Sequence, residues 1–82
     1  MKLGPITNED VGSWCQVVDP AGRVWTIRAR AVTIEKGEFY ECWVNDVMLP
    51  IYWRRERQID DESLLRVFAA GLQYIEGRYA AP

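Results

Sequence analysis

The spacing of apolar residues along this chain changes once, after the arginine-rich segment that ends at Arg57. Before it, apolar and polar residues alternate over short stretches, as they do in strands whose two faces meet different surroundings. After it, apolar residues recur every three or four positions, which is the spacing of one face of a helix. This order predicts a sheet followed by a helix.

Four alternating segments are separated by short stretches rich in turn-forming residues. The strands that we expect are residues 14–18, 24–34, 39–44 and 47–53. Short connections favour antiparallel pairing of strands in chain order. Pro50 in the last segment indicates an edge strand or a bulge, because proline has no N–H for the ladder. The polar, glycine-containing residues 1–12 are expected to form a loose leader.

One helix is expected over residues 60–79. Asp60 can cap its start, and Asp61 and Glu62 suit the positive end of the helix dipole. The apolar residues expected to form its buried stripe are Leu65, Phe68, Leu72, Ile75 and Tyr79. The chain of 82 residues is therefore predicted to be a single α+β domain, a four-stranded antiparallel meander with one C-terminal helix packed on one face.

The turns assign each strand residue to a face of this sheet. With Asn45-Asp46 and Lys36-Gly37 as the centres of two hairpins, Cys42 lies opposite Leu49 and Ala31, and Tyr40 lies opposite Ile51. The residues that we expect on the helix side are Cys15, Val17, Trp25, Ile27, Ala29, Ala31, Tyr40, Cys42, Val44, Val47, Leu49, Ile51 and Trp53.

The opposite face is richer in aromatic residues than a solvated sheet face usually is. The same register places Trp14 opposite Arg28 and Arg30 opposite Trp43, with Phe39 opposite both Ile34 and Tyr52. The candidate interaction residues on this face are Trp14, Arg28, Arg30, Phe39, Trp43, Met48 and Tyr52.

This face has three interpretations. It is an ordinary exposed face with cation–π contacts, a protein interface, or a platform on which single-stranded nucleic-acid bases stack. We favour the interface, in the form of a homodimer or of binding to another protein. Interfaces are enriched in Trp, Tyr, Met and Arg, and one helix leaves one sheet face uncovered.

The nucleic-acid alternative adds a cluster of arginines, Arg54, Arg55 and Arg57, that follows the last strand. Ten basic residues face twelve acidic ones, however, and the net charge is −2. Proteins that bind nucleic acid usually carry a basic excess, because phosphate neutralisation supplies most of their affinity. We therefore expect the arginines to end a strand and to lie near the acidic helix start.

The residue types needed for catalysis or metal binding are scarce. The chain has no histidine, which is the commonest general base and metal ligand. Cys15 and Cys42 fall on the helix side, where buried thiols commonly act as small hydrophobes. We expect a non-enzymatic protein with no cofactor and no metal site. Without an apolar leader or a membrane-spanning run, the expected location is the cytoplasm, with both thiols reduced.

The segment from Glu38 to Tyr79 resembles a small bacterial family of uncharacterised proteins. In that family a Val-Asn-Gly-type hairpin precedes a helix that contains Phe, six further residues and then Ile-Glu or Leu-Glu. Val44-Asn45-Asp46 stands at the hairpin position here, with Asp46 in place of the glycine, and Phe68 and Ile75-Glu76 stand in the helix. The resemblance implies a small cytoplasmic strand–helix domain and no assigned activity.

Overall fold

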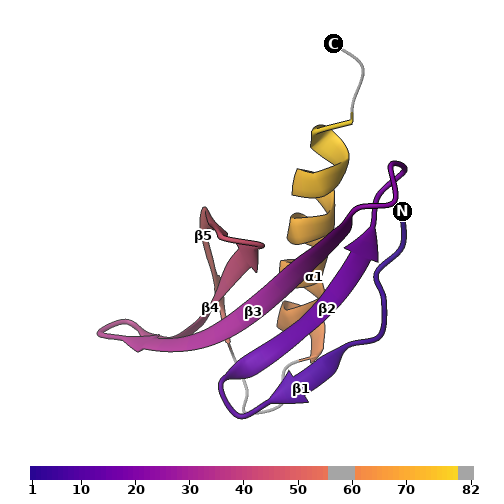
Figure 1. Cartoon of the computed structure of the whole chain (residues 1–82). Helices are drawn as coiled ribbons and strands as arrows, with labels where there is room; N and C mark the ends of the chain where they lie inside the picture. Colours follow the sequence, from indigo (N-terminus) through magenta and orange to yellow (C-terminus); the bar gives the residue numbers. More distant parts are fainter. Residues whose placement is uncertain (56–60, 80–82) are drawn as a thin grey trace.

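The computed structural model describes residues 1–55 and 61–79. Its five strands form one antiparallel sheet in the order β1-β2-β3-β4-β5, and one helix packs across one face, against β3, β4 and β5 (Figure 1). The elements are β1 (Thr7–Glu9), β2 (Gly12–Val18), β3 (Val24–Ile34), β4 (Gly37–Val44), β5 (Val47–Arg54) and α1 (Asp61–Gly77). The α+β class and the meander order are confirmed.

The prediction of four strands is wrong, because part of the expected leader forms β1. Thr7 pairs with Trp14, and Glu9 pairs with Gly12. Gly12 has a φ of 152°, and a Cβ there would lie 2.0 Å from the Ala29 carbonyl oxygen. Only glycine allows the chain to enter β2 this close to β3. Three exposed polar residues carry no apolar alternation, so the pattern used for the other strands does not detect β1.

The β2–β3 hairpin has the predicted register. Trp14 lies opposite Arg28, Val17 opposite Trp25, and Val18 opposite Val24.

In the β3–β4 hairpin the predicted register is wrong by two residues. Glu35 and Lys36 form the turn, and Ile34 pairs with Gly37. Gly37 has a φ of 126°, so it supplies the positive φ at the start of β4 rather than at the centre of the turn. An error of two residues keeps every side chain on its predicted face but changes its neighbours.

The new neighbours are these: Cys42 lies opposite Ala29 instead of Ala31, and Arg28, not Arg30, lies opposite Trp43. Arg30 pairs with Glu41, and Phe39 pairs with Val32 instead of Ile34.

The β4–β5 hairpin begins as predicted and then changes register. Asn45 has a φ of 52° in the two-residue turn, and Val44 pairs with Val47. A bulge follows, since Trp43 pairs with Met48 but Glu41 pairs with Tyr52. The shift spans Pro50 and occurs on an edge strand, which confirms both readings of that proline.

The bulge corrects the partners and the burial expected for β5. Tyr40 lies opposite Trp53 rather than Ile51, and Phe39 lies opposite Arg54 rather than Tyr52. Val47 and Ile51, expected against the helix, are 46% and 51% exposed. They lie on the edge strand, which α1 covers only in part.

Helix α1 buries a stripe centred one position away from the predicted one. Val67, Phe68 and Ile75 are fully buried, whereas Leu65 is 54% exposed. Tyr79 lies beyond the end of the helix rather than in its stripe. The expected cap, Asp60, lies outside the described residues.

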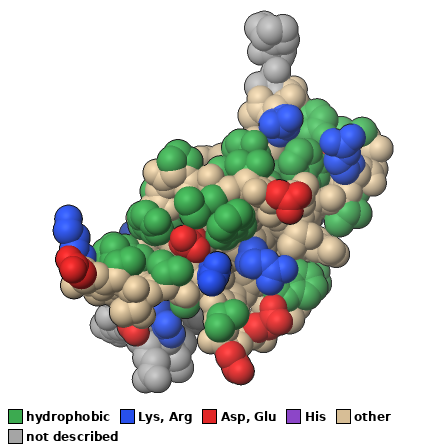
Figure 2. All heavy atoms as spheres, turned by 60° about the vertical axis from the view of Figure 1, so that its left-hand side comes forward, with side chains coloured by type: hydrophobic (Ala, Val, Ile, Leu, Met, Phe, Trp, Pro, Cys, Tyr) green, Lys and Arg blue, Asp and Glu red, His purple; other side chains and the backbone are tan. Residues whose placement is uncertain are grey.

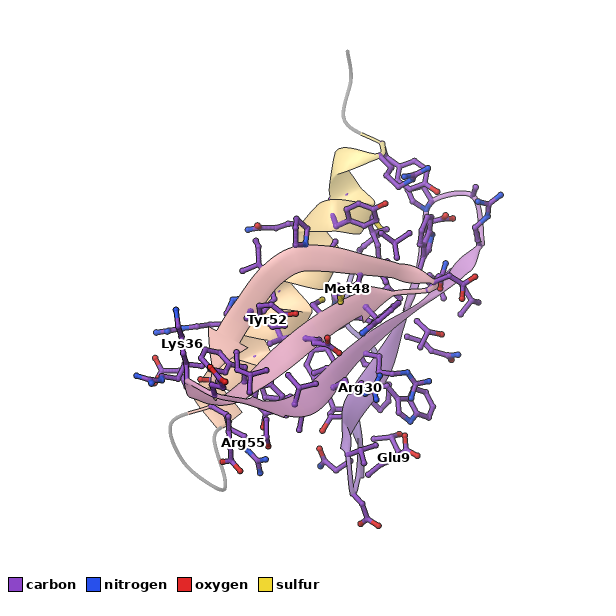
Figure 3. The ribbon with its side chains drawn as sticks, turned by 90° about the vertical axis from the view of Figure 1, so that its left-hand side faces the viewer. Glu9, Arg30, Lys36, Met48, Tyr52 and Arg55 are labelled. Carbon is purple, nitrogen blue, oxygen red and sulfur yellow. The ribbon has the colours of Figure 1, made fainter. Side chains whose placement is uncertain are left out.

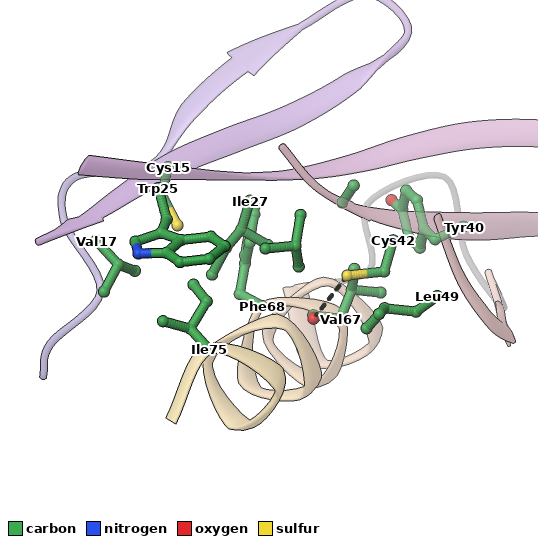
Figure 4. Close-up of a cluster of buried hydrophobic side chains, with 12 residues drawn as sticks. Cys15, Val17, Trp25, Ile27, Tyr40, Cys42, Leu49, Val67, Phe68 and Ile75 are labelled. Carbon is green, nitrogen blue, oxygen red and sulfur yellow. Dashed lines mark hydrogen bonds between the residues drawn. The ribbon is translucent and has the colours of Figure 1, made fainter. Parts of the chain in front are cut away.

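The core fills the space between α1 and the sheet (Figure 4). Its fully buried members include Ile27 and Val44 from the strands and Phe68 from the helix. The Cys42 thiol donates to the Val67 carbonyl, with 3.6 Å between sulfur and oxygen. Burying apolar surface in this layer stabilises the fold by roughly 25 cal/mol per Å².

The closest approach of α1 to the sheet occurs at Gly71, where a Cβ would lie 2.6 Å from Cγ2 of Ile27. We predict that Gly71→Ala lowers the free energy of unfolding by a net of up to about 2 kcal/mol. Overpacking of about 1–3 kcal/mol outweighs the gain of about 1 kcal/mol in helix propensity. Denaturant melts measure the change.

Gly77→Ala is the matched control, because no atom lies within 4 Å of a Cβ at that position. It should be neutral or stabilise by about 0.5 kcal/mol. Equal stabilisation by both substitutions would show that α1 does not approach β3 this closely.

Candidate interaction surface

The sheet face that α1 leaves uncovered is called the open face below. Cross-strand pairing arranges its side chains in two rows that each run across all five strands. The first row is Thr7, Trp14, Arg28, Trp43 and Met48, and the second row is Glu9, Gly12, Arg30, Glu41 and Tyr52. Figure 3 shows Glu9, Arg30, Met48 and Tyr52 on the sheet, with α1 behind it.

The first row has an arginine paired with a tryptophan on each side. Arg28 lies between Trp14 and Trp43 on the neighbouring strands, and Met48 continues the row on β5. The two tryptophans are half-buried, and Met48 is 42% exposed. An apolar strip with a charge inside it therefore reaches solvent.

The second row alternates charges and leaves a gap. Arg30 lies between Gly12 and Glu41 on the neighbouring strands, and Glu9 and Tyr52 lie at the two ends of the row. A recess of about 60 Å³ opens beside Arg30, and Glu9 and Gly12 are among the residues that line it. Arg30 itself is exposed.

Few contacts fix the charged groups of the open face. Arg28 forms an ion pair with Glu9 at 3.7 Å, and both side chains are about half exposed. The indole N–H of Trp43 donates to Oε1 of Glu41 at 3.4 Å. Within residues 1–55 and 61–79, neither Arg30 nor Glu41 forms an ion pair. Exposed pairs such as Arg28–Glu9 contribute little stability, about 0–1 kcal/mol.

Phe39 and its neighbours form a third, shorter group on this face. The Phe39 ring meets the Tyr52 ring edge-on, with centroids 6.3 Å apart. The Arg54 guanidinium lies 5.9 Å from the centre of the Phe39 ring and donates to the Lys36 carbonyl at 3.2 Å. All seven candidate interaction residues therefore lie on the same face of the sheet, as the alternation predicted.

The cation–π contacts lie at other residues than the expected ones. In the described part of the chain, arginines stack on Phe39, Tyr40, Trp25 and Tyr74. The two tryptophans of the first row have no such contact there. Stacked arginines thus lie at the end of β5 and near the end of α1 rather than along the first row.

The nucleic-acid residues are not brought together. Arg54 stacks on Phe39, whereas Arg55 stacks 5.7 Å from the centre of the Tyr40 ring, on the core side. Successive strand residues point to opposite faces, so this separation follows from the pleat. Arg57 lies outside the described residues. Figure 2 shows positive and negative side chains interspersed among hydrophobic ones over this side of the molecule.

The cysteines lie in the core. Both thiols are free and buried. Burial raises the pKa of Cys15, and burial together with the nearby Cys15 raises the pKa of Cys42 to about 11. Reactive cysteines have the opposite shift.

Among the described side chains, no group of three His, Cys, Asp or Glu residues is placed to hold a metal ion. No helix of the described ranges is long and apolar enough to span a membrane.

A buried carboxylate that the sequence did not single out joins the β2–β3 turn to the end of α1. Asp19 is 4% exposed. Its Oδ1 accepts from the Ala21 and Arg23 amides, both at 2.9 Å. Its Oδ2 accepts from the Trp25 indole N–H at 2.8 Å and from the Tyr79 hydroxyl. The Asp-Pro-x-Gly turn signals the first two bonds, but no local pattern indicates Tyr79.

Four donors determine the charge state of Asp19. Burial alone would raise its pKa, but the hydrogen bonds from Tyr79, Trp25 and the two amides outweigh burial and lower the pKa to about 2. The carboxylate is therefore ionised wherever the fold is intact near neutral pH, and its bonds hold the helix end against the turn.

The comparisons with known proteins identify no relative. No family model, curated protein or solved structure matches the chain. The resemblance to a bacterial family stays a prediction.

The lowered pKa of Asp19 predicts an acid limit to stability. The contribution of the Asp19 carboxylate to the free energy of unfolding is complete above its pKa in the unfolded chain, about 3.9. This contribution is lost as pH falls through the folded-state pKa of about 2. We expect the melting temperature to drop between pH 4 and pH 2. In Asp19→Asn the drop should be smaller and the stability at pH 7 lower. Thermal melts across this range by circular dichroism measure both effects.

Tyr79→Phe removes one donor, so the folded-state pKa of Asp19 should rise towards the unfolded value, and the drop should be smaller and end at a higher pH than in the wild type. Asp10→Asn, in the exposed β1–β2 turn, is the control for removing a carboxylate. If Asp19→Asn and Asp10→Asn have the same pH profile, the cluster does not control acid stability.

Proposed function

We propose that this chain is a non-catalytic interaction module that associates with a second copy of itself through the open face. The observation that carries the proposal is the first row, in which Trp14, Trp43 and Met48 form an apolar strip on the sheet face opposite α1, and no helix or strand of residues 1–55 and 61–79 packs over it. Tryptophan, tyrosine, methionine and arginine are the residues that interfaces concentrate, and the tryptophans most often anchor them.

Both edges of the sheet are poorly suited to association by strand addition. β1 has only three residues. β5 has a bulge around Pro50, which lacks an N–H. At the last residue of β5, the Arg54 carbonyl already accepts a hydrogen bond from the Ser63 hydroxyl at 2.9 Å. Short strands, prolines and bulges are the means by which sheets avoid pairing at their edges. The open face is then the surface that favours contact.

Face-to-face packing has a definite geometry. Two sheets pack about 10 Å apart with strand directions within about 30° of each other. Two copies would form four layers, helix, sheet, sheet and helix, and the aromatic rows would become an interior. This arrangement gives each sheet the second cover that a two-layer domain lacks.

Nucleic acid is the less supported occupant of the same face. Arg54 and Arg55 stack on opposite sides of the sheet, so they do not offer phosphates a common surface. Glu9 and Glu41 lie within the second row, where a phosphate backbone would meet negative charge.

The two buried thiols fit a reducing compartment, so we place this self-association in the cytoplasm.

We predict that Trp43→Ala weakens self-association by ~2 kcal/mol or more, about thirtyfold in Kd. Its effect on folding should be about 1 kcal/mol, because Trp43 is half-buried and lies away from α1. Sedimentation equilibrium gives the first quantity and denaturant melts give the second.

Trp25→Ala is the matched comparison. Trp25 is 7% exposed and lies in the core, so its loss should cost about 3–5 kcal/mol of folding free energy. A wild-type protein that stays monomeric at every concentration, or a Trp43→Ala variant that associates normally, would refute the proposed function.

The same preparation tests the nucleic-acid alternative. We expect no binding of a fluorescent single-stranded oligonucleotide at physiological salt. Micromolar binding that weakens with salt and is reduced in Arg54→Ala would reverse the order of the two functions.

A further inference from the structure

We propose that Arg30 and Glu41 determine how two copies align. Arg30 of each copy pairs with Glu41 of the other copy. This inference rests on the proposed self-association. It assigns a specificity role to the second row, whereas the proposed function rests on the first.

The positions of the two residues suit this role. They lie opposite each other on β3 and β4, the middle and fourth strands of the sheet. Arg30 is exposed, and it lines a recess of about 60 Å³ together with Glu9 and Arg28. Glu41 is half-buried and accepts a single weak hydrogen bond, from Trp43.

Burial of the open face requires partners for these charges. Arg28 has Glu9 in its own chain, but in residues 1–55 and 61–79 neither Arg30 nor Glu41 has an ion-pair partner. An unpaired charge taken out of water is strongly unfavourable. A two-fold contact solves this in a symmetric way, since each copy supplies one arginine and one glutamate. Two equivalent pairs then form from a single surface.

The charge pattern favours a second copy over a partner whose charges are mostly of one sign. The two rows of the open face carry Glu9, Arg28, Arg30 and Glu41, so the two signs balance within the rows. A strongly acidic or basic partner would meet repulsion from half of these groups. A surface with both signs side by side is complementary to itself after a two-fold rotation, which is the requirement of an isologous interface.

Charge reversal tests the pairing between copies. Arg30→Glu places negative charges at both positions 30 and 41, and Glu41→Arg places positive charges at both. Each variant alone should lose self-association by at least about tenfold in Kd. An equimolar mixture should regain it as a heterodimer, to within about threefold of the wild type. Sedimentation of fluorescently labelled Arg30→Glu with unlabelled Glu41→Arg measures this directly.

The double variant, Arg30→Glu with Glu41→Arg in one chain, is the control for damage to the face. It restores opposite charges, so it should associate like the wild type. Thermal melts of all three variants check that each is folded.

The outcomes separate the inference from the proposed function. Rescue in the mixture supports pairing between copies. If Trp43→Ala blocks association but the single charge reversals do not, the open face is an interface and the pairing inference is wrong. If the reversals block association and the mixture shows no rescue, the pairing is also wrong. A monomeric wild type overturns both proposals.

Discussion

A single helix can shield one side of a sheet, and in this chain Gly71 allows α1 to lie in close contact with Ile27 on the shielded side. The missing side chain lets α1 lie against β3, and Val67, Phe68 and Ile75 reach full burial as a result. The two rows of the open face lie on the side that points away from α1, because successive strand residues point to opposite faces. The proposed association would cover these rows with a second copy.

The assignment of residues to faces could be predicted from the sequence, while the pairing of residues could not. Alternation alone assigns Trp25 to the core and Trp43 to the open face, since neighbouring strand residues point opposite ways. Pairing depends on a few turn and bulge residues. The positive φ of Gly37 and the bulge at Pro50 each shift a hairpin by two positions. Such shifts preserve the faces, so the candidate residues stay together although their neighbours change.

The remaining differences arise where local pattern carries no signal. β1 consists of three polar residues that pair with β2. The strand therefore depends on this pairing and not on an apolar pattern within Thr7–Glu9. It adds Glu9 to the open face and supplies the partner of Arg28. Asp19 and Tyr79 are 60 positions apart, and only the folded chain brings them together. Sequence periodicity reports burial well, but it cannot report which distant polar groups will meet.

The Asp19 cluster also has a consequence for synthesis of the chain. Each hairpin of the meander joins strands that are adjacent in sequence, so the sheet can pair strand by strand as it emerges from the ribosome. Its core face, however, stays uncovered until α1 has emerged, and the turn at Asp19 lacks two of its four donors until Trp25 and then Tyr79 are in place. A nascent chain that stalls before the helix would expose the apolar residues of both sheet faces at once, and exposed apolar surface of this kind promotes aggregation.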